Sequence, residues 1–278
     1  MYPELKGKVA VITGAGRRQG IGEAMARRLA MEGCRVVLTD IGHAEGEHMP
    51  ESAVGTASEM QQIVDEICAE GGKARSFNCN VLNPEEIQAA AEFAIESFGA
   101  LDIWVNNAGI GYLMKPIVEM SVEEWDTVLG VNLRGVFLGI QAAATIMIDQ
   151  GRGGRIINIG SQASKSGFGH ASAYTTSKHG MVGLTRVAAM ELGEHGINVN
   201  TICPNHITTG LGAWQNDHFS GVTGRELDQY MADMRGRIPL GRPGLQEDIA
   251  KACAFLCSDQ AVYITAESMN VSGGEEYH

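Results

Sequence analysis

Two residues that could move a proton lie one helical turn apart. Tyr174 and Lys178 belong to the segment SAYTTSKHGMVGLTRVAAMELG, whose apolar positions recur with helical spacing. Residues four apart share a helix face, so we expect the phenol and the ammonium to project side by side. A phenol with a pKa of about 10 is a poor base at neutral pH, but an adjacent positive charge favours the phenolate. The pair could therefore exchange a proton with an alcohol during hydride transfer.

Two further polar residues could complete such a site. Ser161 ends the β-rich run GRIINIGS, and Asn132 lies in the helical segment GVNLRGVF. A hydroxyl beside the phenol would hold the substrate oxygen where negative charge develops, which is a polarising role and not a nucleophilic one. Taken singly, each residue has an ordinary structural explanation in packing, capping or a helix irregularity. Their joint occurrence predicts a catalytic group of Asn132, Ser161, Tyr174 and Lys178.

A glycine-rich turn near the N-terminus could bind a nucleotide. The run TGAGRRQGIG, residues 13–22, follows the apolar run KVAVIT and precedes the amphipathic segment GEAMARRLAMEG. Glycines let a backbone approach a pyrophosphate closely, and a helix N-terminus offers free N–H groups and the positive end of its dipole. We expect cofactor contacts from Gly14, Arg18, Gly20 and Ile21.

An acidic residue at the end of the second strand favours NAD over NADP. Asp40 ends the run RVVLTD, where a carboxylate can accept hydrogen bonds from both ribose hydroxyls of NAD. It would repel a 2′-phosphate, because two like charges about 4 Å apart repel by roughly 1 to 4 kcal/mol at effective dielectric constants of about 80 to 20. Arg17 and Arg18 act in the opposite direction, since a guanidinium could pair with that phosphate. The strand end fixes Asp40 better, so we expect NAD.

The elements that must position these residues alternate between β-rich runs and helical stretches. Seven runs read as strands: KVAVIT (8–13), RVVLTD (35–40), RSFNCNV (75–81), DIWVNNAG (102–109), GRIINIGS (154–161), INVNTICP (197–204) and ESMNVSGG (267–274). Such alternation implies parallel strands joined by crossover helices on both faces. The sequence predicts an α/β fold, a doubly wound Rossmann sheet of seven mostly parallel strands in a single domain, residues 1–278.

Two segments extend this minimal plan. Residues 42–57 are rich in small, polar and turn-forming residues and predict an inserted loop near the cofactor. Residues 210–237 mix aromatic and polar residues after the sixth strand, which favours a substrate lid over a helical excursion that only fills space.

Composition limits the classes of partner. The 278 residues carry 21 basic and 33 acidic side chains, a net charge of −12, so nothing favours nucleic acid or an anionic membrane. No uninterrupted apolar run approaches the roughly 18 residues of a spanning helix, and the N-terminus lacks a signal-peptide pattern; we expect a cytoplasmic protein. The six scattered cysteines show no zinc spacing, so we expect reduced thiols and no metal site.

The motifs together resemble the short-chain dehydrogenase/reductase family over essentially the whole chain. The glycine turn, NNAG (106–109), VNL with Asn132, the Ser161, Tyr174 and Lys178 spacing, and the segment 204–209 occur in the family's order. The resemblance implies that Tyr174 is the acid/base and that Lys178 lowers its pKa and binds ribose. It further implies that Ser161 holds the substrate oxygen and that Asn132 anchors a water-linked proton path.

The resemblance implies further contacts. Residues expected to touch NAD, besides Tyr174 and Lys178, are Asp40, Asn80, Val81, Asn107, Ile207 and Thr209, with Asn80 in a position where the family often has Asp. The family usually reads Pro-Gly after the sixth strand, whereas this chain reads Pro204-Asn205. The residues expected at the substrate are therefore Ser161, Gln162, Tyr174, Asn205, His206 and Trp214. Helices such as those with Asn132 and Tyr174 pair across subunits in the family, which implies a homotetramer or homodimer.

The predicted function is hydride transfer between NAD and a secondary alcohol or ketone, such as a cyclic alcohol, a polyol or a sugar derivative. The glycine turn, two residues longer than usual, the insertion and the altered Pro-Gly resemble the carveol-dehydrogenase-like branch, some of whose members hold NAD tightly and use another redox partner. A 3-oxoacyl reductase using NAD(P)H is an alternative, which Asp40 disfavours. A non-catalytic nucleotide-binding sensor is another, which the intact four-residue group disfavours.

Overall fold

A seven-stranded parallel sheet organises the protein. The computed structural model describes residues 1–44 and 54–277. Its strands are β1 (Val9–Thr13), β2 (Arg35–Asp40), β3 (Lys73–Asn78), β4 (Ile103–Asn106), β5 (Gly154–Ile159), β6 (Ile197–Pro204) and β7 (Ser268–Val271). They lie in the order β3-β2-β1-β4-β5-β6-β7, and each neighbouring pair is parallel. The predicted doubly wound α/β fold is confirmed.

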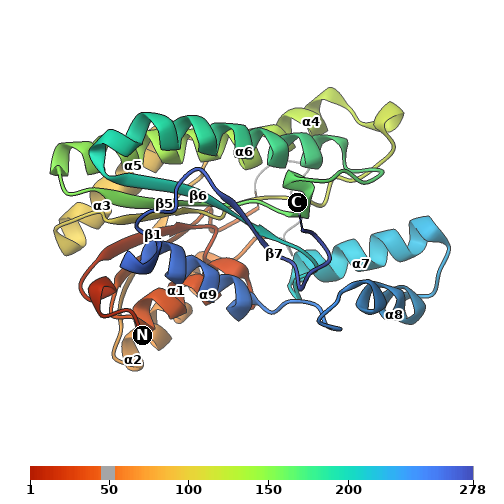
Figure 1. Cartoon of the computed structure of the whole chain (residues 1–278), viewed down its shortest axis with the longest axis horizontal. Helices are drawn as coiled ribbons and strands as arrows, with labels where there is room; N and C mark the ends of the chain where they lie inside the picture. The colour runs from red at the N-terminus through yellow and green to blue at the C-terminus, as the bar shows by residue number, and fades with distance from the viewer. Residues whose placement is uncertain (45–53, 278) are drawn as a thin grey trace.

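Helices cover both faces of the sheet (Figure 1). Their bounds are α1 (Ile21–Met31), α2 (Ala57–Ala69), α3 (Pro84–Phe98), α4 (Val122–Leu129), α5 (Gly135–Gln150), α6 (Ser172–Leu192), α7 (Gly210–Thr223), α8 (Leu227–Arg237) and α9 (Gln246–Cys257). One core layer packs α1, α2 and α9 against the sheet, and the other packs α3, α5 and α6 against its opposite face. Because both faces are covered, every residue of β1 is buried, as its continuous apolar run predicts.

The chain from Val122 to Gln150 is one long helix interrupted by a π-helical turn at Gly130–Arg134. By length and composition alone this helix could cross a membrane, although Asn132, Arg134 and Gln141 interrupt its apolar residues, so it holds no uninterrupted apolar run of about 18 residues. However, 61% of its most apolar window is buried inside the protein. The apolar residues therefore form part of the core between α3 and α6.

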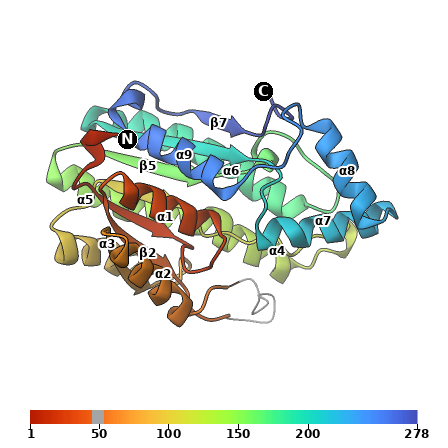
Figure 2. The ribbon, with the colours of Figure 1, turned by 90° about the horizontal axis from the view of Figure 1, so that it is seen from below.

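The described parts of the two predicted extensions lie beside the carboxyl ends of the strands. Residues 45–53 of the expected insertion at 42–57 lie outside the described residues. Its far end contacts the glycine turn, since a Cβ on Gly55 would lie 2.3 Å from the Gly16 carbonyl oxygen. The predicted lid, 210–237, comprises α7 and α8, which project past the sheet (Figures 1 and 2).

Candidate active site

A cavity of about 880 Å³ lies at the carboxyl ends of the strands. Parallel α/β sheets bind their ligands at this edge, where loops from several strands converge. The cavity runs from Gly14 and Asp40 at one end to Tyr174 and the lid helix α7 at the other. It brings together most of the predicted cofactor contacts: Gly14, Gly20, Ile21, Asp40, Asn80, Val81, Asn107, Tyr174, Lys178, Ile207 and Thr209.

The glycine turn forms a cradle that side chains would fill. Gly14 has φ +65°, and a Cβ there would lie 2.6 Å from Ala108 Cα. A Cβ on Gly22 would lie 2.5 Å from the Gly14 carbonyl oxygen. Asn107 braces the turn, because its Nδ2 donates to the carbonyl oxygens of Thr13 at 2.8 Å and Gly14 at 2.9 Å. A backbone this bare, at the start of α1, fits a dinucleotide pyrophosphate.

Asp40 connects the end of β2 to this cradle. Its Oδ2 accepts a hydrogen bond of 2.8 Å from the Gly16 N–H, and its Oδ1 accepts one of 2.9 Å from the Ile41 N–H. Burial raises the pKa of the Asp40 carboxyl, while these two hydrogen bonds oppose the rise. The carboxylate lines the cavity, as its position at the strand end predicts.

The structure does not bring Arg18 to the cavity. The Arg18 guanidinium pairs with Glu66 of α2 at 2.6 Å, and its backbone N–H donates to Glu59 Oε1 at 2.8 Å. Its neighbour Arg17 lines the cavity instead and donates from Nη1 to the Tyr112 hydroxyl at 3.0 Å. The sequence could not separate these adjacent arginines, because the longer turn removes a fixed register for them.

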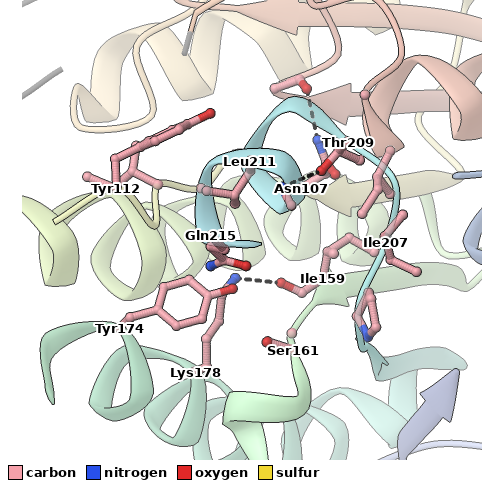
Figure 3. Close-up of a pocket in the computed structure, with 18 of the residues that line it drawn as sticks. Asn107, Tyr112, Ile159, Ser161, Tyr174, Lys178, Ile207, Thr209, Leu211 and Gln215 are labelled. Atoms are coloured by element: carbon pink, nitrogen blue, oxygen red, sulfur yellow. Dashed lines mark hydrogen bonds between the residues drawn. The ribbon is translucent and has the colours of Figure 1, made fainter. Parts of the chain in front are cut away.

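Three residues of the predicted catalytic group, Ser161, Tyr174 and Lys178, lie together at α6 (Figure 3). Tyr174 and Lys178 are both buried and project from the same face of this helix. Lys178 Nζ donates to the Ile159 carbonyl oxygen at 2.8 Å and lies 5.7 Å from the centre of the Tyr174 ring. Ser161, directly after β5, interacts with the Tyr174 hydroxyl. The structure therefore places the phenol, the ammonium and the serine hydroxyl at one wall of the cavity.

Burial controls the ionisation of this pair. It raises the pKa of Tyr174, and the interaction with the Ser161 hydroxyl partly opposes that rise. It lowers the pKa of Lys178 to about 8. The direction for Tyr174 is opposite to the lowering that the sequence analysis expected from Lys178, because removal from water disfavours both charged forms. A positive charge brought beside Tyr174 would favour its phenolate.

Asn132 lies behind this group in the π-helical turn. Fully buried, it accepts a hydrogen bond from the Ile110 N–H through Oδ1 and donates to the Ile110 carbonyl oxygen through Nδ2, both at 2.8 Å. Its Nδ2 also donates to Ser177 Oγ at 3.3 Å, and Ser177 Oγ donates to the Tyr174 carbonyl oxygen at 2.7 Å. π-Helical turns are frequent at functional sites. In this turn Asn132 forms hydrogen bonds both to the loop after β4 and to α6, and so links the two.

The predicted substrate contacts divide into two groups. Gln162, Asn205 and His206 line the cavity with Ser161 and Tyr174. Trp214 does not: its ring stacks on His218 at 5.1 Å and meets the ring of the cavity-lining Tyr112 edge-on at 5.4 Å. Trp214 therefore anchors the lid helix to the loop after β4.

Residues near the C-terminus reach the cavity, which the sequence analysis missed. Glu275 Oε2 accepts from Asn205 Nδ2 at 2.8 Å and lies 3.3 Å from His206 Nε2. Burial lowers the pKa of His206 while Glu275 opposes that change. Glu276 Oε1 accepts from Gln162 Nε2 at 3.0 Å. No local pattern signals this return of the chain after β7.

The described residues contain no group of three or more His, Cys, Asp or Glu side chains that could hold a metal ion. All six cysteines are free thiols, five of them buried.

Comparisons with known proteins identify the family of the chain. An enoyl-(acyl carrier protein) reductase family model matches residues 14–276. Cyclohexanol dehydrogenase of Acinetobacter sp. (strain SE19) is 37% identical over 98% of this chain and 96% of its own. The 3-oxoacyl-(acyl-carrier-protein) reductase of Staphylococcus aureus is 37% identical over 96% of this chain and 97% of its own. A variant of actinorhodin polyketide ketoreductase, solved with NADPH, matches at TM-score 0.87 and 32% identity over 100% of both chains.

The fold, the motifs and these relatives define an oxidoreductase of the Rossmann type. The chain belongs to the short-chain dehydrogenase/reductase family.

Proposed function

We propose that the protein is an NAD-dependent dehydrogenase that interconverts a secondary alcohol and its ketone. The observation that carries the proposal is the burial of Tyr174 and Lys178 side by side, facing Ser161, at the end of a cavity whose other end is the glycine cradle and Asp40. This arrangement supports a nucleotide and a small alcohol in one continuous space.

The residues have distinct roles in the proposed reaction. A bound nicotinamide would accept or donate the hydride. Tyr174 takes the alcohol proton during oxidation and returns it to the carbonyl oxygen during reduction. Ser161 holds that oxygen by a hydrogen bond, which is strongest where negative charge develops. The ammonium of Lys178, when protonated, favours the phenolate of Tyr174. Asn132 hydrogen-bonds the Ile110 backbone and Ser177 of α6, and so holds the position of the helix that carries Tyr174.

Asp40 supports NAD as the cofactor. Its carboxylate lines the adenosine end of the cavity and is held there by the Gly16 N–H. A 2′-phosphate placed beside it would be repelled, whereas ribose hydroxyls would donate hydrogen bonds. Arg17 lies in the same wall and acts in the opposite direction, although its Nη1 already donates to Tyr112.

A 3-oxoacyl reductase using NADPH is the second candidate, because a 3-oxoacyl-(acyl-carrier-protein) reductase is as similar to this chain as a cyclohexanol dehydrogenase. The test is to follow absorbance of reduced nicotinamide with NAD or NADP and a panel of secondary alcohols, and with NADH or NADPH and a 3-oxoacyl thioester. Alcohol turnover with NAD supports the proposal. Preferred reduction of the thioester with NADPH would contradict it.

The nucleotide that remains on the purified protein separates two further possibilities. Nicotinamide that resists dialysis, with turnover only when an external electron acceptor is added, would favour the tightly held cofactor of the carveol-dehydrogenase-like branch. Nucleotide binding with no turnover in any assay would favour a sensor. The Tyr174→Phe variant is the control in each assay, because it keeps the ring and removes the acid/base.

We also propose that the protein forms a homodimer or homotetramer. Exposed apolar side chains on α5 and α6 support this: Phe137 is 46%, Val187 51% and Met190 81% exposed. Exposed apolar side chains on neighbouring helices favour burial against a second copy. Gel filtration with light scattering measures the mass, and a monomer would contradict the proposal.

A further inference from the structure

The lid helix α7 presents one face to the cavity, and side chains of this face also approach Gly111 in the loop after β4. The residues of α7 that line the cavity are Leu211, Gly212, Gln215, Asn216, Phe219 and Thr223. They recur with helical spacing, whereas Trp214 and His218, which stack on each other, lie about 60° to 100° around the helix from Gln215 and do not line the cavity. The aromatic contacts of Trp214 and His218 therefore fix which α7 side chains face Tyr174.

Gln215 lies directly beside the catalytic tyrosine. A Cβ built on Gly111 would lie 3.1 Å from Tyr174 Cε2, 3.3 Å from Gln215 Nε2 and 3.4 Å from Leu211 Cδ1, so these three groups converge on one point. Figure 3 shows the Gln215 amide approaching the Tyr174 hydroxyl from α7, while Ser161 approaches from β5. The amide thus borders the space for carbons next to the reacting carbinol.

The Gln215 amide differs from the other polar groups at this end of the cavity. Gln162, Asn205 and His206 each face a glutamate of the C-terminal segment. In the described parts of the chain, no hydrogen bond joins the Gln215 side chain to another residue, although Gln215 is partly buried. An amide in this position needs a partner when substrate displaces water from it.

The chemistry of the partner follows from the position of the amide. A simple alcohol would place a hydrocarbon group against Gln215 and strip water from the amide without replacing it. A substrate with a second hydroxyl next to the reacting carbon would restore the lost hydrogen bond, since a glutamine amide can donate and accept. The α7 side chains beside Tyr174 would therefore distinguish substrates by a second polar group and not by size alone.

We propose that Gln215 hydrogen-bonds a second oxygen of the substrate, so that the enzyme prefers vicinal diols and polyols over simple secondary alcohols. This inference rests on the proposed dehydrogenase activity and names its substrate class. In the reaction the carbinol C–H bond breaks with hydride transfer to NAD, the O–H proton passes to Tyr174, and the product is an α-hydroxyketone. Gln215 contacts the hydroxyl that does not react.

The test compares matched substrates and matched variants. Rates are measured with butane-2,3-diol against butan-2-ol, and with cyclohexane-1,2-diol against cyclohexanol, for the wild type and Gln215→Met. Loss of one hydrogen bond is expected to lower kcat/KM for the diols about three- to tenfold and to leave the simple alcohols within about twofold. Gln229→Met is the control, since Gln229 is exposed on α8 and bonds only Asp233 among described residues. It should change neither ratio.

Three outcomes would overturn the inference: an unchanged diol preference in Gln215→Met, an equal loss for diols and simple alcohols, or a rise confined to the KM for NAD. The last would make Gln215 a cofactor contact.

A second readout separates this inference from the proposed function. Thermal midpoints are measured with NAD and each diol or simple alcohol. A diol-specific rise that disappears in Gln215→Met supports the contact even if no alcohol is turned over, in which case only the proposed dehydrogenation fails. Equal shifts for the wild type and Gln215→Met would overturn the contact.

Discussion

Arg237, the last residue of α8, donates from Nε to Glu275 Oε1 at 3.0 Å and so joins the lid to the C-terminal segment. The other carboxylate oxygen of Glu275 accepts from Asn205 Nδ2 at 2.8 Å. Glu275 is thus shared between the lid and the end of β6, and its side chain is only 13% exposed. The Arg237 side chain is 50% exposed, whereas Asn205 is buried, so water weakens the bond from Asn205 to Glu275 less than it weakens the ion pair with Arg237.

We predict that Glu275→Gln loosens the lid. Losing the charge should raise the KM for the substrate about three- to tenfold with a smaller change in kcat, because each weakened hydrogen bond to a charged group is worth roughly 1 kcal/mol or more. Steady-state kinetics and limited proteolysis at the turn between α7 and α8 measure the effect. Asp233→Asn is the matched control, because it breaks an exposed pair with Arg225 on the same lid. Equal effects of both variants would contradict a specific role for Glu275.

Tyr174 should make the two directions of the reaction depend oppositely on pH. Oxidation needs the phenolate, whose formation burial disfavours, so its rate should rise from neutral to alkaline pH, while ketone reduction needs the protonated phenol and should fall. The Ser161 hydroxyl lowers the pKa of Tyr174, so Ser161→Ala should move both profiles to higher pH. Profiles of kcat/KM in both directions test this. A shift to lower pH in Ser161→Ala would show that the serine does not favour the phenolate.

Lys178 should be needed for activity and should lower the free energy of unfolding. Burial lowers its pKa to about 8 from an ordinary value of 10.5, so between these values the unfolded chain binds more protons and the free energy of unfolding rises with pH. At pH 7 Lys178 is mostly protonated in the folded protein, so nearly the whole cost of burying its charge is present. Lys178→Met should therefore raise the free energy of unfolding by about 2 kcal/mol at neutral pH, after loss of the hydrogen bond to Ile159, while activity disappears.

Urea unfolding of wild type and Lys178→Met at neutral and alkaline pH measures this effect. The gain should shrink above the ordinary pKa of lysine, where both states of the wild type have lost the proton. Lys251→Met, at an exposed position of α9, is the control and should change stability little at either pH. A gain that is independent of pH would indicate better packing and not the removal of a buried charge.

The features predictable from sequence are those set by local spacing. The strands follow from continuous apolar runs, and Tyr174 and Lys178 meet because they are four residues apart on one helix. The contacts that could not be predicted depend on the direction of side chains around a helix or on segments distant in sequence. Trp214 and Gln215 are neighbours, yet a step of about 100° around α7 turns one toward Tyr112 and the other toward Tyr174. Glu275 reaches Asn205 only because the chain returns after β7, which no local pattern encodes.

Asp40→Asn should shift the cofactor preference toward NADP. Asparagine keeps one oxygen that can accept from the Gly16 N–H, a bond of 2.8 Å in the wild type, but its amide nitrogen cannot accept from the Ile41 N–H. The KM for NAD of the variant therefore checks that the glycine turn keeps its shape. Removing the charge removes a repulsion of roughly 1 to 4 kcal/mol toward a 2′-phosphate, which predicts an increase of about tenfold or more in the NADP-to-NAD ratio of kcat/KM. Asp65→Asn, at an exposed position of α2, is the control for net charge. If the wild type already prefers NADP, or if both variants shift the ratio equally, Asp40 does not select the cofactor, and Arg17 in the same wall becomes the residue to test.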